Sequence, residues 1–164
     1  MKTLTYATLL FSLFFPKSYA ITPNKGIVPP TIEKPLTSQN IAVIKAYAVQ
    51  EAKIYGIDPT KILWILSKES QDCQNLTGDD GNSRGCMMIS SLYHPEVSRS
   101  CAMNLQCSLQ WSLNFMAKNP NNMNQWSTWS CRYAWYPDAT STLGPAPKNY
   151  KEPSYCKWKP TGRK

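Results

Sequence analysis

The chain has 164 residues, of which 42% are hydrophobic and 12% aromatic, and its formal net charge is +8. This length suits one domain, or two at most, and the apolar content is enough for a buried core, which excludes a disordered tail. With 7 glycines, collagen-like and glycine-linker sequences are excluded as well. No apolar run reaches the roughly 18 residues that a bilayer span needs, so we expect no stable membrane insertion.

Residues 1–20 have the pattern of a secretory signal peptide. Lys2 provides a positive start, residues 5–15 are mostly apolar but too short to span a membrane, and Ser18 and Ala20 place small residues at a cleavage site. We therefore expect a secreted or periplasmic protein. Removal of this leader, which carries two lysines, leaves a net charge of +6.

Prolines divide the remaining chain into three parts. Residues 21–36 are proline-rich and predict an extended N-terminal arm, and residues 37–136 have the regular apolar patterns of a folded domain. Residues 137–164 are again proline-rich and predict an irregular C-terminal extension.

Two helices are predicted at the start of the folded domain. The first begins at a capping Thr37 or Ser38, has apolar residues at helical spacing, and ends at Gly56. In the second, Asp58 is the cap and Pro59 occupies the first turn, where a missing N–H costs nothing. Its surface is apolar on nearly all sides.

The later segments alternate between turns and helices. Residues 72–86 are rich in Gly, Asp and Asn and predict a small irregular hairpin. Helical patterning returns over residues 104–117, residues 119–122 are predicted as a loop, and the aromatic-dense residues 126–136 are predicted as a final helix. The fold class is therefore mainly α, in the α+β sense, with one small β-hairpin region.

All six cysteines lie after the leader. In an oxidising compartment an even number of cysteines indicates disulfides, whereas zinc would need closely spaced cysteine pairs or histidine partners, and His94 is the single histidine. Among the many possible pairings, we favour Cys101 with Cys107 as a local pair. Cys156 is expected to tie the C-terminal extension to the body.

Glu69 is the residue best placed for chemistry, because it ends the apolar second helix opposite the polar residues 72–86. Apolar surroundings disfavour a charged carboxylate, so we expect the pKa of Glu69 to be raised. An acid that stays partly protonated near neutral pH can donate a proton to a leaving oxygen. The alternative is a solvated helix-end residue, paired with Lys68 or Arg84.

The residues around Glu69 resemble the opening of lytic transglycosylase domains and goose-type lysozymes. Residues 55–70 read YGIDPTKILWILSKES and resemble the family pattern YGxDPxLLxAIxxxES, in which the Glu is the catalytic acid. Residues 81–89 (GNSRGCMMI) resemble the segment SxGLMQI, and residues 104–111 (NLQCSLQW) resemble the helix NIxAGxxY. The resemblance covers about residues 38–136 and implies a lysozyme-like fold.

This resemblance implies an enzyme that cleaves the β-1,4 bond between N-acetylmuramic acid and N-acetylglucosamine, with Glu69 as general acid and base. Peptidoglycan strands are the expected partner, a monomer is the expected state, and no metal or organic cofactor is implied. The positive charge suits an anionic polymer. Nucleic acid is disfavoured by the leader and by the scattered basic residues.

The candidate substrate-binding residues are Ser83, Met88 and Tyr133. Met88 stands where the family has Gln, and the family's later AYN segment is reduced here to Tyr133 and Ala134, without the Asn. These departures keep open a catalytically inactive, lysozyme-fold protein that binds wall glycan. A cationic secreted antimicrobial or adhesin is a third possibility.

Asp79 and Asp80 follow Glu69 by ten and eleven residues, within the predicted hairpin. A Glu and an Asp at this spacing also resemble invertebrate-type and phage lysozymes, which are hydrolases. Hydrolases commonly use a second carboxylate as nucleophile or to activate water. Lytic transglycosylases manage with one, because a hydroxyl of the sugar attacks. The alternative for both aspartates is turn chemistry, since Asp-Gly favours turns.

Overall fold

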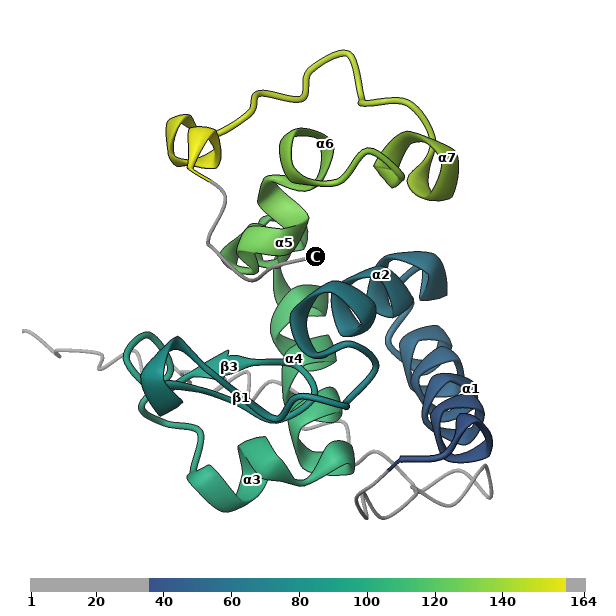
Figure 1. Cartoon of the computed structure of the whole chain (residues 1–164), viewed down its shortest axis with the longest axis vertical. Coiled ribbons are helices and arrows are strands. Elements are labelled where there is room, and N and C mark those ends of the chain that lie inside the picture. Colours follow the sequence, from purple (N-terminus) through teal and green to yellow (C-terminus); the bar gives the residue numbers. More distant parts are fainter. Residues whose placement is uncertain (1–35, 159–164) are drawn as a thin grey trace, which may run out of the picture.

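The computed structural model describes residues 36–158 (Figure 1). The expected signal peptide, nearly all of the N-terminal arm and residues 159–164 lie outside the described residues. Within them, the protein is mostly helical, with one small antiparallel sheet of three strands and three disulfides. The predicted fold class, mainly α and disulfide-stapled, is confirmed.

The first two helices follow the predicted caps. Helix α1 (Ser38–Ile54) is capped by Thr37, whose hydroxyl accepts a hydrogen bond from the backbone N–H of Asn40 at 3.1 Å, while the side chain of Asn40 accepts one from the backbone of Thr37. Helix α2 (Pro59–Ser70) begins after Asp58, whose carboxylate accepts the N–H of Thr60 at 2.9 Å.

The turn-rich segment forms a larger sheet than the predicted hairpin. Strands β1 (Thr77–Gly78) and β2 (Ser83–Arg84) pair around the short 3-10 helix η1 (Asp79–Gly81). Strand β3 (Ile89–Ser90) then adds to β2 as a third antiparallel strand. Strands of two residues are too short to show an alternating pattern in the sequence, so β3 was not predicted.

Gly85 lets the turn between β2 and β3 pack against the next helix, α3 (Arg99–Met103), which the sequence analysis did not predict. Gly85 has a φ of 74°, and a Cβ atom there would lie 1.7 Å from the carbonyl oxygen of Ala102. A larger residue therefore has no room. Asn104 then caps helix α4 (Leu105–Lys118), close to the predicted helix over 104–117.

Two predictions in the following segment are corrected by the structure. The predicted loop at 119–122 belongs to a 3-10 helix, η2 (Pro120–Gln125), because the side chain of Asn119 caps it. The predicted final helix is split into α5 (Ser127–Ser130) and α6 (Arg132–Trp135). The hydroxyl of Ser130 bonds to carbonyl oxygens of the preceding turn, which competes with a continuous helix.

The C-terminal extension is mostly irregular, as predicted, but contains helix α7 (Ala139–Leu143) and the 3-10 helix η3 (Ser154–Lys157). Both favoured disulfide predictions are confirmed: Cys101 pairs with Cys107, and Cys156 is tied to the body through Cys131. The remaining bond joins Cys73 to Cys86.

The core is formed where α1, α2 and α4 meet. In Figure 1, α4 runs through the middle of the molecule, with α1 to one side, the small sheet to the other, and α5, α6 and α7 beyond α2. The central side chains are fully buried aliphatic residues: Ile44, Ile62, Ile65, Leu66, Leu109 and Leu113. No helix within residues 36–158 is long and apolar enough to cross a membrane.

Candidate active site

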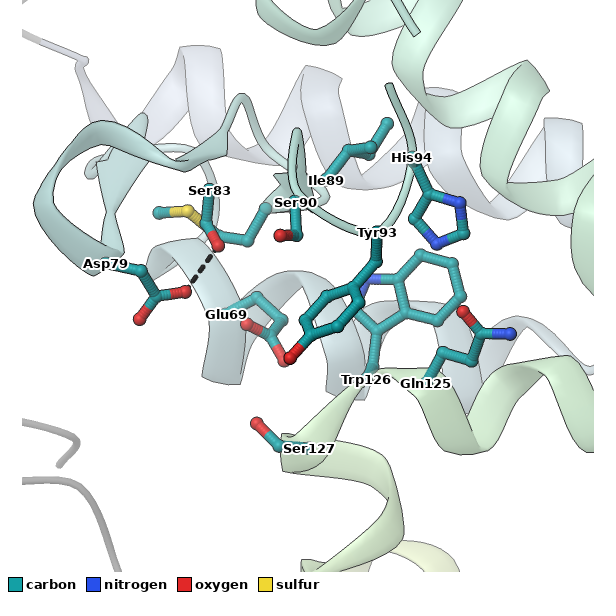
Figure 2. A pocket seen from close by; sticks show the side chains of 11 residues that line it. Glu69, Asp79, Ser83, Ile89, Ser90, Tyr93, His94, Gln125, Trp126 and Ser127 are labelled. Carbon is teal, nitrogen blue, oxygen red and sulfur yellow. Dashed lines mark hydrogen bonds between the residues drawn. The ribbon is translucent and has the colours of Figure 1, made fainter. Parts of the chain in front are cut away.

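A pocket of about 180 Å³ lies between the end of α2, the small sheet, the loop after β3 and the start of α5 (Figure 2). Its lining combines two carboxyl groups, serine hydroxyls, an amide and aromatic rings. The lining residues are Glu69, Asp79, Ser83, Met88, Ile89, Ser90, Tyr93, His94, Gln125, Trp126 and Ser127.

Glu69 is the last residue but one of α2, and its side chain is half-buried at the pocket. Its Oε1 accepts a hydrogen bond from the hydroxyl of Thr128 at 2.6 Å, and Thr128 itself is 0% exposed. Glu69 therefore lies at the boundary between the core and an open pocket, where the sequence analysis expected it. That its carboxyl group stays partly protonated near neutral pH remains a prediction.

The end of α2 is held rigidly around this glutamate. The hydroxyl of Ser70 donates to the carbonyl of Leu66 at 3.0 Å and accepts the N–H of Cys73 at 2.9 Å. Cys73 is in turn bonded to Cys86, in the turn between β2 and β3. A covalent link thus joins the helix that carries Glu69 to the sheet that forms the facing wall.

The two basic residues considered as partners of Glu69 make other contacts. The ammonium of Lys68 lies 2.9 Å from the carboxylate of Asp138 and rests over the ring of Trp64. The guanidinium of Arg84 donates to the carbonyl oxygen of Gly81 at 2.9 Å. The first interaction joins two distant segments of the chain, and the second stays within the hairpin.

Of the two aspartates, Asp79 lines the pocket and Asp80 does not. Asp79 accepts a hydrogen bond from the hydroxyl of Ser83, on the opposite strand of the hairpin (Figure 2). Both aspartates have the left-handed φ values typical of a tight turn, 50° and 53°. In Figure 2, the side chain of Glu69 lies between those of Asp79 and Tyr93.

The predicted substrate-binding residues separate into two places. Ser83 and Met88 line the pocket with Glu69. Tyr133 is not among the lining residues: it lies on α6, where its hydroxyl donates to the carbonyl oxygen of Gly144 at 3.2 Å and its ring packs on Tyr150. The structure therefore brings four of the six predicted site residues together and leaves Asp80 and Tyr133 outside this pocket.

Several lining residues were not singled out as site residues from the sequence. Tyr93 is 80% exposed, and the adjacent His94 packs against the rings of Trp111 and Phe115 at centroid distances of 4.7 and 5.1 Å. The indole N–H of Trp126 donates to the carbonyl of Met87 at 2.7 Å. Most of these residues belong to irregular segments, which have no periodic pattern that could have revealed them.

The carboxyl groups of the pocket could exchange protons with a bound molecule that is neutral or positively charged. No lysine or arginine is among the residues that line the pocket, whereas two carboxyl groups face it. In the described part of the chain, no group of three or more His, Cys, Asp or Glu side chains could hold a metal ion.

No protein-family model, curated protein or solved structure matches this chain.

Proposed function

We propose that the protein is a secreted peptidoglycan-cleaving enzyme, a muramidase or lytic transglycosylase, that cuts the β-1,4 bond between N-acetylmuramic acid and N-acetylglucosamine. The observation that carries this proposal is a half-buried Glu69, held by a buried hydroxyl, in a pocket that also contains Asp79. The resemblance of residues 55–70 to the opening of lytic transglycosylase domains supports the same role for Glu69.

In the first step, Glu69 donates its proton to the bridging oxygen while the bond between that oxygen and the anomeric carbon breaks through an oxocarbenium-like state. The resulting carboxylate then acts as a base. It removes a proton either from a water molecule or from the 6-hydroxyl of the muramoyl residue, which gives a reducing end or a 1,6-anhydro end. Asp79 is placed to stabilise the cationic state or to hold the water.

The rim of the pocket suits a sugar chain. A carbohydrate ring has an apolar face of C–H groups that packs on aromatic rings, and the exposed ring of Tyr93 offers such a surface beside Glu69. Gln125 and Ser127 supply an amide and a hydroxyl for the polar edge of the sugar. The positive net charge of the chain favours association with an anionic wall polymer.

The test measures the release of soluble fragments from purified sacculi by the variant Glu69→Gln. This substitution removes the transferable proton but keeps the shape of the side chain. We expect no detectable release, with Glu152→Gln, an exposed glutamate of the C-terminal extension, as a matched control that keeps full activity. Mass spectrometry of the fragments then identifies reducing or anhydro ends. A release rate close to that of the unmodified protein in Glu69→Gln would reject the mechanism.

A second candidate function is glycan binding without turnover. The observation that favours it is Met88, which lines the pocket at the position where the resembling family has Gln. This candidate predicts that the unmodified protein sediments with sacculi and releases nothing. A cationic antimicrobial or adhesin, by contrast, would keep its activity in Glu69→Gln and lose it with added salt.

A further inference from the structure

Thr128 is a buried polar residue whose hydroxyl bonds to a carboxyl group of the pocket. Its side chain lies in the core, 0% exposed, and its hydroxyl hydrogen donates to Oε1 of Glu69 at 2.6 Å. The two residues are 59 positions apart in the chain. A short hydrogen bond from a hydroxyl to a carboxyl group restricts the rotation of a side chain that otherwise has three free torsions.

The helix that carries Thr128 is itself fixed by the C-terminal extension. The carbonyl oxygen of Ser130 accepts a hydrogen bond from the hydroxyl of Tyr150 at 2.6 Å, and the hydroxyl of Ser130 lies 2.8 Å from that of Tyr155. The disulfide between Cys131 and Cys156 joins the same two segments covalently. Thr128 is therefore placed by contacts that do not involve Glu69.

Ser83 also lines the pocket beside Glu69, but its hydroxyl does not bond to that carboxyl group. Its hydroxyl donates to Asp79 instead. The hydrogen bond from Thr128 ties the Glu69 carboxyl to the core. Catalysis by a proton donor depends on holding that donor close to its ideal position relative to the reacting bond.

We propose that Thr128 is a positioning residue, whose hydroxyl holds the carboxyl group of Glu69 toward the pocket, with the C-terminal extension keeping α5 in place for this contact. This inference rests on the proposed role of Glu69 as the acid. The role belongs to the hydroxyl rather than to the bulk of the side chain, so serine can replace threonine and valine cannot.

The first test compares Thr128→Val, which removes the hydroxyl, with Thr128→Ser, which retains it. We expect the rate of fragment release at saturating sacculi to fall about tenfold in Thr128→Val and to recover in Thr128→Ser. The sacculus concentration at half-maximal rate should stay unchanged. Ser112→Ala is the control, because it removes a buried hydroxyl on α4 that has no hydrogen-bond partner among the described residues.

The second test follows Glu69 itself and needs no activity. The carboxyl carbon of Glu69 is observed by NMR in protein labelled with ¹³C-glutamate and assigned by its loss in Glu69→Gln. A donated hydrogen bond stabilises the charged carboxylate, so its removal in Thr128→Val should move the titration midpoint of Glu69 to higher pH. The alkaline limb of the pH–rate profile, where the acid loses its proton, should move in the same direction. Asp79, Tyr93 and His94, the other titratable groups that line the pocket, are the same in every variant.

The outcomes separate the inference from the proposed function. Thr128→Val that titrates and cleaves like the unmodified protein overturns the positioning role and leaves Glu69 as the acid. Full activity in Glu69→Gln overturns the proposed function, whatever Thr128→Val does. Circular dichroism checks folding, and Thr128→Ala, which adds no bulk to the core, replaces Thr128→Val if that variant does not fold.

Discussion

Asp79 and Asp80 are neighbours with almost the same φ angle, but their side chains have different surroundings. The carboxylate of Asp79 bonds to Ser83 and lines the pocket, whereas Asp80 is outside the lining. From the sequence the two are equivalent, because adjacent residues in a turn have no pattern that shows which one points inward. The hairpin register, with Gly78 opposite Ser83, brings Asp79 next to that serine.

This difference predicts unequal effects of two matched substitutions. Asp79→Asn should lower hydrolytic release of fragments from sacculi about a hundredfold, while Asp80→Asn leaves the rate unchanged. Asparagine tolerates the left-handed φ of both positions, so neither turn should be disturbed. If both variants cleave equally well and yield anhydro ends, the single-carboxylate route of a lytic transglycosylase holds instead.

The C-terminal extension links helices α5 and α6. Besides the disulfide of Cys156 with Cys131, the indole N–H of Trp135 donates to the carbonyl of Cys156 at 2.6 Å. The buried guanidinium of Arg132 lies over the ring of Tyr150 at 4.8 Å from its centroid. Residues 137–158, part of a segment predicted as irregular, are therefore held against the rest of the fold mainly by side chains.

We expect the disulfides Cys101–Cys107 and Cys131–Cys156 to differ in their contribution to stability. Because the bond between Cys131 and Cys156 closes a loop of 25 residues, replacing both cysteines by alanine should lower the free energy of unfolding by about 3.5 kcal/mol. The same replacement of Cys101 and Cys107, 6 residues apart, should cost about 2 kcal/mol. Urea denaturation measures both, and equal losses would contradict the loop-length argument.

At the scale of the whole molecule, the core between α1 and α4 contains polar groups whose ionisation opposes folding. Tyr47 is 2% exposed, and burial, reinforced by the negative charge of Glu51, raises its pKa far above the ordinary value of 10.0. Burial also raises the pKa of Tyr55 and Tyr150. The folded state therefore holds these phenolic protons more tightly than the unfolded chain does.

The free energy of unfolding should accordingly decrease at alkaline pH. Because the tyrosine pKa values are raised on folding, their contribution is complete below the ordinary value of 10.0, and the free energy of unfolding falls as the pH rises above it. Tyr47→Phe should make this fall shallower, while Tyr93→Phe, at an exposed position, should leave it unchanged. Urea denaturation over a series of alkaline pH values measures the slope, and identical slopes in the two variants would refute the assignment to Tyr47.

Interactions between near neighbours explain why the long helices could be predicted. Thr37 and Asp58 lie within three residues of the N–H groups that they cap, and the apolar spacing of α1, α2 and α4 repeats within each helix. The position of Glu69 at the end of α2 follows from the same local pattern. The pairing of Cys101 with Cys107 was also predictable, because the two are close in the chain.

Contacts between distant segments could not be predicted from the sequence and are seen only in the tertiary structure. Thr128 reaches Glu69 across 59 positions, Lys68 reaches Asp138 across 70, and Tyr133 faces the C-terminal extension rather than the pocket. Such contacts depend on how α2, the small sheet and α5 pack, and packing is set by the sum of many weak interactions rather than by any short motif. The position of Glu69 near the end of an apolar helix is thus determined by the order of residues, whereas the hydroxyl that bonds to it depends on the tertiary structure.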